Sequence, residues 1–182
     1  MRFFDVFFSF TGILVLSPVI IVLFFIGFFD TGIPIFKQER LGKDMRTFNL
    51  LKFRSMNVDT FSVATHLVDK RSITRWGSFL RKSKLDELPQ LFNVLIGDMS
   101  FVGPRPNLLN QEELTRERAI RGIYSVRPGI TGLAQIQSID MSTPILLAQT
   151  DAQMIAGWNV YSYFRFIFLT LFGKGFGDRV RQ

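Results

Sequence analysis

The sequence predicts a mostly helical α/β domain that is attached to a membrane by an apolar N-terminal helix. Three observations carry this prediction: a long uncharged segment near the N-terminus, two short strand-like runs after it, and amphipathic helical patterns further along. The 182 residues suit one compact domain with at most one appended segment. A mean hydropathy of +0.22 and 21 phenylalanines are too apolar for an ordinary soluble domain, so we expect part of the surface to face lipid.

The charge balance and the missing residue types narrow the chemistry. Lys and Arg total 22 against 15 Asp and Glu, and the net charge of +7 favours phospholipid head groups, phosphorylated substrates or nucleic acids as partners. The absence of Cys excludes disulfides, thiolate catalysis and Cys-bound zinc, and a single histidine, His66, excludes a His-based metal site. Any metal would therefore be a hard cation bound by oxygen.

The segment from Val6 to Phe29 carries no charge, and as a helix it would reach about 36 Å, enough to cross a bilayer. A secretory signal peptide fits poorly, because the apolar core is too long and no small-residue cleavage site follows. Near its middle, Pro18 lacks the N–H that would bond to the carbonyl of Leu14, so we expect a kink at Ser17-Pro18.

Two outcomes of this kink stay open from the residues alone. The helix either crosses the bilayer with a bend or returns to the face it entered from, with the freed carbonyl satisfied by Ser17 or a neighbour. The positive-inside rule places the following segment in the cytoplasm, because it is rich in basic residues. These residues are Lys37, Arg40, Lys43 and Arg46.

Short apolar and aromatic runs after the membrane helix predict two strands, Pro34–Gln38 and Thr47–Phe53. Val58–Lys70 has no clear period and is expected to be a loop. The stretch "RWGSFLRKS" that follows predicts an amphipathic helix from about Ile73. Further along, "QEELTRERAIRGIY" (Gln111–Tyr124) predicts a polar surface helix.

The last apolar element, Trp158–Phe172, is interrupted by Arg165 and would reach only about 22 Å as a helix, too short to span a bilayer. Its aromatic density favours a helix in the head-group plane, with Arg165 extending to phosphates. A buried core helix with one paired arginine is the alternative. The glycine-rich end, residues 173–182, is interpreted as a frayed tail.

The stretch "LDELPQLFNVL" sets two carboxylates, Asp86 and Glu87, side by side in a basic part of the chain. Proline is tolerated only in the first turn of a helix, so Pro89 predicts a helix that begins at about residues 86–88 and continues through Gln90–Leu95. Asp86 would then cap this helix. The simpler interpretation ends there, but a helix start beside the basic run Arg81–Lys84 attracts phosphate. A carboxylate held there is positioned to attack phosphorus or to hold Mg²⁺ against it.

Three other segments have the composition of anion-binding sites. "KFRSM" puts Lys52 and Arg54 on one side of a strand, and "GPRP" holds Arg105 between two prolines, which restricts where its guanidinium points. "RPGITG" combines Arg127 with glycines whose backbone can approach a ligand closely. Each arginine alone is more typical of a structural or surface residue. Together with Arg81 and the carboxylate pair, they predict a phosphate-handling site at a bilayer surface.

These segments also resemble a known family. "KFRSM", "LDELPQLFNVLIGDMSFVGPRP" and "RPGITGLAQ", in this order after a Ser-Pro-containing membrane helix, are similar to the monotopic phosphoglycosyl transferases, also called the bacterial sugar transferase family. The resemblance covers about residues 2–135. The chain resembles the family's minimal form, a catalytic domain without additional membrane spans.

The resemblance implies transfer of a phospho-sugar from a UDP-sugar to polyprenyl (undecaprenyl) phosphate, with release of UMP, at the start of bacterial glycoconjugate assembly. Asp86 would be the nucleophile, giving a covalent phospho-sugar enzyme, and Mg²⁺ would lie against Asp86 with Glu87 assisting. Residues 1–32 would form a re-entrant anchor. Residues 33–182 would form a catalytic domain on the cytoplasmic face of the inner membrane, with a membrane-associated C-terminal helix and interfacial amphipathic helices. A homodimer is compatible with this scheme, and nucleic acid is not an expected partner.

Beyond Gln135 the chain departs from the family pattern. An Asn/Ser-Gly-Arg stretch is replaced by "IQSID" (Ile136–Asp140), and the tyrosine expected three residues after Asp151 is Met154. The sugar is therefore not predicted. Other membrane phosphotransferases need several spans, and metal-dependent glycosyltransferases need an Asp-x-Asp motif that is absent. A basic membrane-tethered binding module needs no carboxylate pair inside its most basic region.

Overall fold

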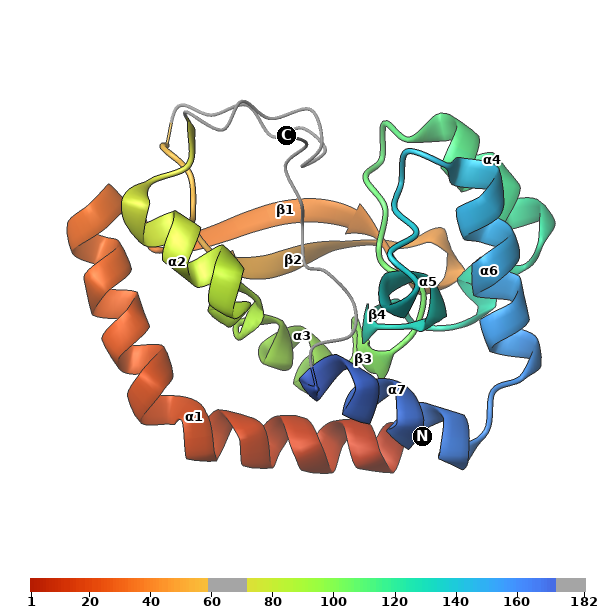
Figure 1. Ribbon diagram of the computed structural model, residues 1–182, viewed down its shortest axis with the longest axis horizontal. Helices are drawn as coiled ribbons and strands as arrows, with labels where there is room; N and C mark the ends of the chain where they lie inside the picture. The colour runs from red at the N-terminus through yellow and green to blue at the C-terminus, as the bar shows by residue number, and fades with distance from the viewer. Residues whose placement is uncertain (59–71, 173–182) are drawn as a thin grey trace.

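The computed structural model describes residues 1–58 and 72–172. Figure 1 shows a long bent helix, α1, along two sides of a body built from a two-stranded hairpin and short helices, with α7 beside the N-terminal half of α1. The predicted loop at residues 58–70 lies outside the described residues except for residue 58, and so does the predicted tail. In chain order the elements, with η for 3₁₀ helices, are α1 (Arg2–Thr31), β1 (Ile35–Leu41), η1 (Lys43–Met45), β2 (Thr47–Phe53), α2 (Arg75–Ser83), η4 (Leu85–Glu87), α3 (Gln90–Ile96), β3 (Ser100–Val102), α4 (Glu112–Ile120), η5 (Ile123–Ser125), β4 (Gly129–Thr131), α5 (Leu133–Ile136), α6 (Pro144–Ala156) and α7 (Val160–Leu171).

The long helix α1 bends near its middle, as Pro18 predicts (Figure 1). The hydroxyl of Ser17 donates a hydrogen bond of 2.8 Å to the carbonyl of Leu14, the group that Pro18 leaves without its usual N–H partner. The predicted kink and the predicted replacement donor are both confirmed.

Most of α1 lies outside the core. It is long and apolar enough to cross a membrane, and only 11% of its most apolar 18-residue stretch is buried. Large side chains such as Phe10, Val15 and Phe29 are more than half exposed. An apolar surface of this size on a helix indicates association with a membrane.

The hairpin of β1 and β2 is antiparallel, with Ile35 opposite Phe53 and Leu41 opposite Thr47. The second strand has the predicted bounds. The first continues three residues beyond the predicted end at Gln38, because its pairing with β2 extends through the charged residues Glu39 and Arg40.

The predicted N-cap role of Asp86 is wrong. Helix α2 ends at Lys84, which adopts a left-handed conformation with φ of 58°, and Leu85–Glu87 then form the separate 3₁₀ turn η4. Helix α3 starts only after Pro89, which occupies the capping position without a side-chain hydrogen bond. The 3₁₀ turn separates the acidic pair from the helix, so Asp86 is held by the turn and its packing.

Two short parallel strands, β3 and β4, join the Gly-Pro-Arg-Pro turn to the Arg-Pro-Gly turn, with Ser100 opposite Gly129. A Cβ atom at Gly129 would lie 2.1 Å from the backbone nitrogen of Gly103, and one at Gly103 would lie 2.4 Å from the carbonyl oxygen of Arg127. The sequence predicted that the backbone of the Arg-Pro-Gly turn can approach a ligand closely. In the structure the close approach is between this turn and the backbone at Gly103.

Two of the predicted helices differ in detail. Helix α4 is shorter than Gln111–Tyr124, and it is not only a surface helix, because Leu114 and Arg118 are buried. In α7, Tyr163 and Phe166 pack into a cluster with Val102, whereas Arg165 is exposed. The helix therefore has one core face and one exposed apolar face; the large exposed side chains are Val160, Tyr161, Phe164, Phe168 and Leu171.

Candidate functional site

Asp86 and Glu87 lie in η4, which stands between α2 and α3 in the chain and contacts α2 and β2. Asp86 is only 7% exposed. The leucines on either side of the pair, Leu85 and Leu88, pack on the cluster formed by Leu23, Phe53 and Leu80. Leu23 belongs to α1, so the leucines that flank the two carboxylates share a hydrophobic cluster with this helix.

Glu87 joins two of the predicted phosphate-binding residues. Its Oε1 atom lies 3.2 Å from Nζ of Lys52 and 3.4 Å from a guanidinium nitrogen of Arg105. The side chains are 16%, 10% and 22% exposed respectively, so the cluster is largely shielded from water. The structure thus brings Lys52, Glu87 and Arg105 together beside Asp86, although they come from β2, η4 and the turn after β3.

Asn93 fixes the distance between α3 and β2. Its side-chain oxygen accepts a hydrogen bond of 3.0 Å from the backbone N–H of Leu51, and its amide nitrogen donates one of 2.8 Å to the carbonyl of Asn49. Asn93 is 1% exposed. These bonds satisfy backbone groups on the outer edge of β2 and hold Lys52 opposite Glu87. Sequence reasoning missed this residue, because nothing local marks an asparagine that bonds to a strand 42 residues away.

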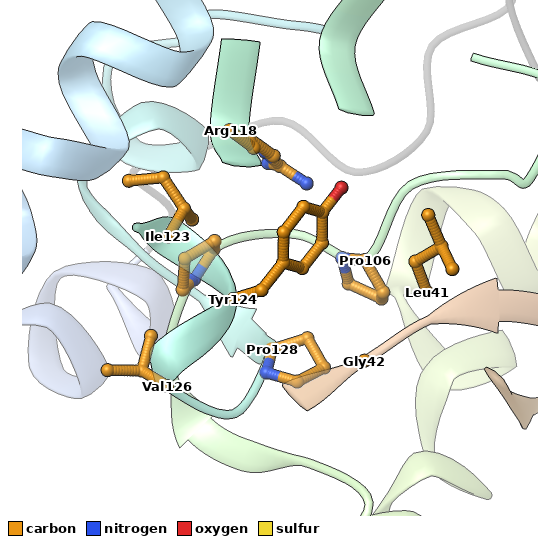
Figure 2. A pocket seen from close by; sticks show the side chains of 9 residues that line it. Leu41, Gly42, Pro106, Arg118, Ile123, Tyr124, Val126 and Pro128 are labelled. Carbon is orange, nitrogen blue, oxygen red and sulfur yellow. The ribbon is translucent and has the colours of Figure 1, made fainter. Parts of the chain in front are cut away.

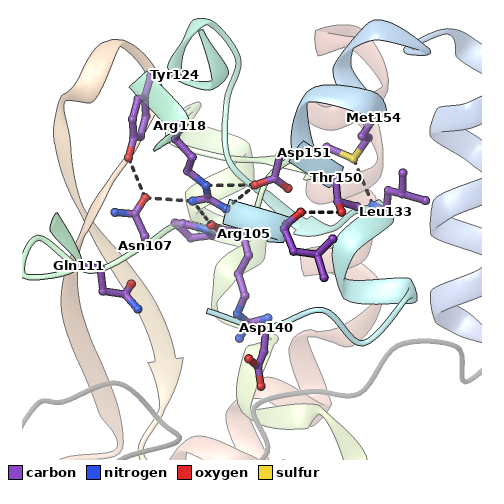
Figure 3. Close-up of polar contacts among 12 residues, drawn as sticks. Arg105, Asn107, Gln111, Arg118, Tyr124, Leu133, Asp140, Thr150, Asp151 and Met154 are labelled. Carbon is purple, nitrogen blue, oxygen red and sulfur yellow. Dashed lines mark hydrogen bonds and ion pairs between the residues drawn. The ribbon is translucent and has the colours of Figure 1, made fainter. Parts of the chain in front are cut away.

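The Pro-Arg-Pro turn that carries Arg105 is held by two other arginines. Arg118 donates a hydrogen bond of 2.8 Å to the carbonyl of Arg105 (Figure 3). Arg40 donates one of 3.1 Å to the carbonyl of Pro106. Both are buried. Neither arginine was predicted as a site residue. For Arg40 the sequence does hold a signal: a charged residue stands at a strand position whose side chain faces the core.

Arg118 is paired with Asp151, from α6, in a buried ion pair of 2.7 Å. Burial raises the pKa of Asp151, and the neighbouring Arg118 opposes that rise. Arg118 also donates a hydrogen bond of 3.0 Å to the side-chain oxygen of Asn107. The same oxygen accepts a hydrogen bond from the hydroxyl of Tyr124 (Figure 3). Asp151 is therefore linked, through Arg118, to the backbone of the turn that carries Arg105.

Two small hollows flank this turn. Figure 2 shows the one in which the ring of Tyr124 lies between prolines with its hydroxyl directed toward Arg118. The other lies on the side of α3 and is more polar. It is lined by Arg40, Leu50, Gln90, Arg105, Pro106 and Gly129.

The remaining predicted site residues are Arg54, Arg81 and Arg127. Arg54 donates to the carbonyl of Ile33 at 3.0 Å and lies over the ring of Phe36, and Arg127 donates to the carbonyl of Gly97 at 2.8 Å. Arg81 occupies the last turn of α2. Their assignment to substrate phosphate stays a prediction.

The chain matches the bacterial sugar transferase family over residues 1–175. It belongs to this family. It is 39% identical over 184 residues to a UDP-glucose:undecaprenyl-phosphate glucose-1-phosphate transferase of Klebsiella pneumoniae, covering 94% of this chain and 39% of the relative. It is 38% identical over 184 residues to galactosyl transferase CpsE of Streptococcus agalactiae, covering 93% and 41%. The chain thus spans about two fifths of the length of these relatives.

A shorter relative is matched over nearly all of its length. The exopolysaccharide production protein PSS of Rhizobium leguminosarum is 36% identical over 196 residues, covering 96% of this chain and 97% of the relative. The family match over residues 1–175 includes every residue of the site described above.

Within the part of the chain that the structure describes, acidic side chains that could bind a metal do not gather in large groups. Residues 1–58 and 72–172 contain no group of three or more acidic or histidine side chains that could hold an ion. Magnesium is commonly held by one or two carboxylates, with water and substrate phosphate as its other ligands, and the Asp86–Glu87 pair fits that mode. Oε1 of Glu87 faces the cations of Lys52 and Arg105.

Proposed function

We propose that the protein transfers a phospho-sugar from a UDP-sugar to undecaprenyl phosphate, giving undecaprenyl-diphosphate-sugar and UMP. The observation that carries this proposal is the cluster of Lys52, Glu87 and Arg105 beside the buried Asp86, in a turn whose flanking leucines pack on a cluster that includes Leu23 of α1. It pairs a carboxylate nucleophile with cations that attract phosphate, at the place where a lipid substrate would arrive. Family membership and the names of the relatives support the same reaction.

In the first step a carboxylate oxygen of Asp86 attacks the β-phosphorus of the UDP-sugar. The bond between this phosphorus and the bridging oxygen breaks, UMP leaves with that oxygen, and the phospho-sugar is attached to Asp86. Lys52 and Arg105 offset the negative charge that would otherwise repel the carboxylate. Glu87 keeps these two cations in place.

In the second step a phosphate oxygen of undecaprenyl phosphate attacks the same phosphorus. The bond to Asp86 breaks, its carboxylate is regenerated, and the lipid diphosphate sugar forms. Splitting one displacement into two lets a single cationic site serve both substrates in turn. Bound magnesium, held by Asp86 with Glu87 beside it, would supply further neutralisation of phosphate charge.

We also propose that α1 is re-entrant and that both of its ends lie on the cytoplasmic face of the inner membrane. Its first half contacts the body through Arg2 and Asp5, and its second half does so through Leu23. A helix that crossed the bilayer would have to place one of these contacts on the far side. The exposed aromatic face of α7 would lie in the head-group region beside α1.

The test is an assay of UMP release by the purified protein in nanodiscs with Mg²⁺, undecaprenyl phosphate and a panel of UDP-sugars. Wild-type protein should release UMP with at least one sugar, and without the lipid acceptor it should gain the mass of one phospho-sugar. Asp86→Asn should lower turnover on the order of 10³-fold or more and abolish the mass gain, because an amide is a poor nucleophile.

The matched control is Asp44→Asn, an equally small change at an exposed residue of η1. It should leave turnover unchanged. Turnover by Asp86→Asn close to that of wild type would refute the nucleophile assignment. Wild-type protein that released UMP with none of the sugars would refute the proposed reaction.

A further inference from the structure

The first residues of the membrane helix point inward, to the segment that connects the two halves of the site. Arg2 donates hydrogen bonds to the carbonyls of Val94, at 2.5 Å, and Leu95, at 2.7 Å. These carbonyls belong to the last turn of α3, where backbone acceptors have no partner within the helix and carry partial negative charge. The forked guanidinium of Arg2 therefore caps the helix that follows the acidic pair.

Asp5 makes a second attachment one turn further along α1. One of its oxygens accepts hydrogen bonds from the hydroxyl of Ser100 at 2.9 Å, from the backbone N–H of Phe101 at 3.1 Å and from the hydroxyl of Tyr163 at 2.7 Å. Asp5 is 2% exposed, and a buried carboxylate is tolerated only with such donors. Burial and the nearby Asp5 raise the pKa of Tyr163, so its hydroxyl keeps the proton that it donates.

The segment held in this way, residues 94–101, leads from α3 to β3. Helix α3, from which the segment starts, follows the turn with Asp86 and Glu87. Strand β3, to which the segment leads, precedes the turn with Arg105. Arg127 donates to the carbonyl of Gly97 in the middle of the segment. Its position therefore determines the spacing between the nucleophile side and the cationic side of the site.

We propose that Arg2 and Asp5 are positioning residues for phospho-sugar transfer. Their contacts make the alignment of Asp86 with Arg105 depend on how α1 is attached to the rest of the protein. This inference rests on the proposed function. A charge near the end of a membrane helix is ordinarily explained by the positive-inside rule, but that rule requires only a charge near the interface. It does not require a bidentate contact with α3, nor an inward-facing carboxylate three residues later.

The test compares Arg2→Lys, Arg2→Met, Asp5→Asn and Asp5→Leu in the full chain in nanodiscs. Lysine keeps the positive charge, but its ammonium group cannot donate two parallel hydrogen bonds to neighbouring carbonyls as the planar guanidinium of arginine does. Arg2→Met should lower kcat on the order of 10²-fold while KM for the UDP-sugar changes less than about threefold, because Arg2 touches no substrate. Arg2→Lys should recover little of this loss. Asp5→Asn, which keeps an acceptor oxygen, should recover more activity than Asp5→Leu.

Hydrogen exchange of residues 94–101, measured without substrates, separates this inference from the proposed reaction. The amide of Phe101 bonds directly to Asp5, so its exchange should become faster in Asp5→Leu, and exchange in the segment should also become faster in Arg2→Met. Arg46→Met, at an exposed arginine of the body, is the matched control and should change neither exchange nor kcat.

Full activity in Arg2→Lys together with unchanged exchange would overturn the inference, because charge alone would then suffice. Unchanged exchange and kcat in both Arg2→Met and Asp5→Leu would overturn it as well. If the exchange results were as expected but wild-type protein released no UMP, the attachment would stand and the proposed reaction would fail. If Asp5→Leu does not fold, the comparison of kcat and hydrogen exchange between Arg2→Lys and Arg2→Met still tests the inference.

Discussion

Glu87 faces Lys52 and Arg105 with the same oxygen, so the charge state of this one residue controls how two cations are held. Hydrogen bonds in which both partners are charged are about twice as strong as neutral ones. An amide at this position would keep the shape of the side chain but would remove the negative charge that faces both cations.

We therefore expect Glu87→Gln to fold normally and to lower kcat/KM on the order of 10²-fold, because Lys52 and Arg105 lose their alignment toward substrate phosphate. The measurement is UMP release over a range of UDP-sugar concentrations. Glu113→Gln, at an exposed glutamate of α4, is the control and should have no effect. A Glu87→Gln variant that kept full kcat/KM would show that the ion pairs do not organise the site.

At the scale of single residues, the sequence predicted those site members that stand in recognisable short patterns. The acidic pair beside Pro89, Lys52 in its strand and Arg105 between two prolines are all of this kind. Asn93 and Arg118 were not predicted, because their roles depend on bonds to distant backbone. A buried arginine in a helix that is rich in charged residues has the same local pattern as an exposed one.

Helices α4 and α6 are joined through the buried pair of Arg118 and Asp151, whose side chains are 2% and 1% exposed. Removing one member leaves the other charge buried without compensation, which costs about 3–5 kcal/mol of the free energy of unfolding. Replacing both with apolar residues removes that penalty. It still leaves the carbonyl of Arg105 without its donor.

We expect Arg118→Met and Asp151→Leu each to lower the thermal unfolding temperature strongly, and the double variant to recover part of the loss. The coupling energy from this double-mutant cycle should be about 1–3 kcal/mol. The double variant should remain less active than wild type, because the Arg105 turn is no longer fixed. Glu117→Gln, which breaks the more exposed pair with Arg121, should cost at most about 1 kcal/mol. Strictly additive effects of the two substitutions would contradict a coupled pair.

At the scale of elements, prediction succeeded where a local pattern decides the structure. Strand β2 and helix α2 have clear periodicity and near-exact bounds. The parallel pair β3 and β4 was missed, since three residues per strand are too few for a pattern and their partners lie 29 residues apart. The capping role of Asp86 was mispredicted because Lys84 in a left-handed conformation starts a separate turn, a choice that propensity does not reveal.

The whole molecule is organised by the bend in α1. Both halves of this helix contact the same body, the first through Arg2 and Asp5 and the second through the cluster around Leu23. The sequence predicted the bend from Ser17-Pro18. It left open whether the helix crosses the bilayer or returns, because that depends on whether the body offers contacts to both halves.

Straightening α1 should therefore change the topology of the protein. In the double variant Ser17→Ala/Pro18→Leu, Leu14 regains a normal helical partner, and a straight helix of 30 residues is long enough to cross the bilayer. The measurement uses two cysteines, one in an extension before Met1 and one that replaces Ser83; the chain has no other cysteine. In wild type, an impermeant maleimide should label both from the same face of the membrane. In the variant the two should label from opposite faces and kcat should fall, since Arg2 and Asp5 are drawn away from residues 94–101. Val19→Leu, an apolar change beside the bend, should behave as wild type. Opposite-face labelling of the wild-type protein would show that α1 crosses the bilayer and is not re-entrant.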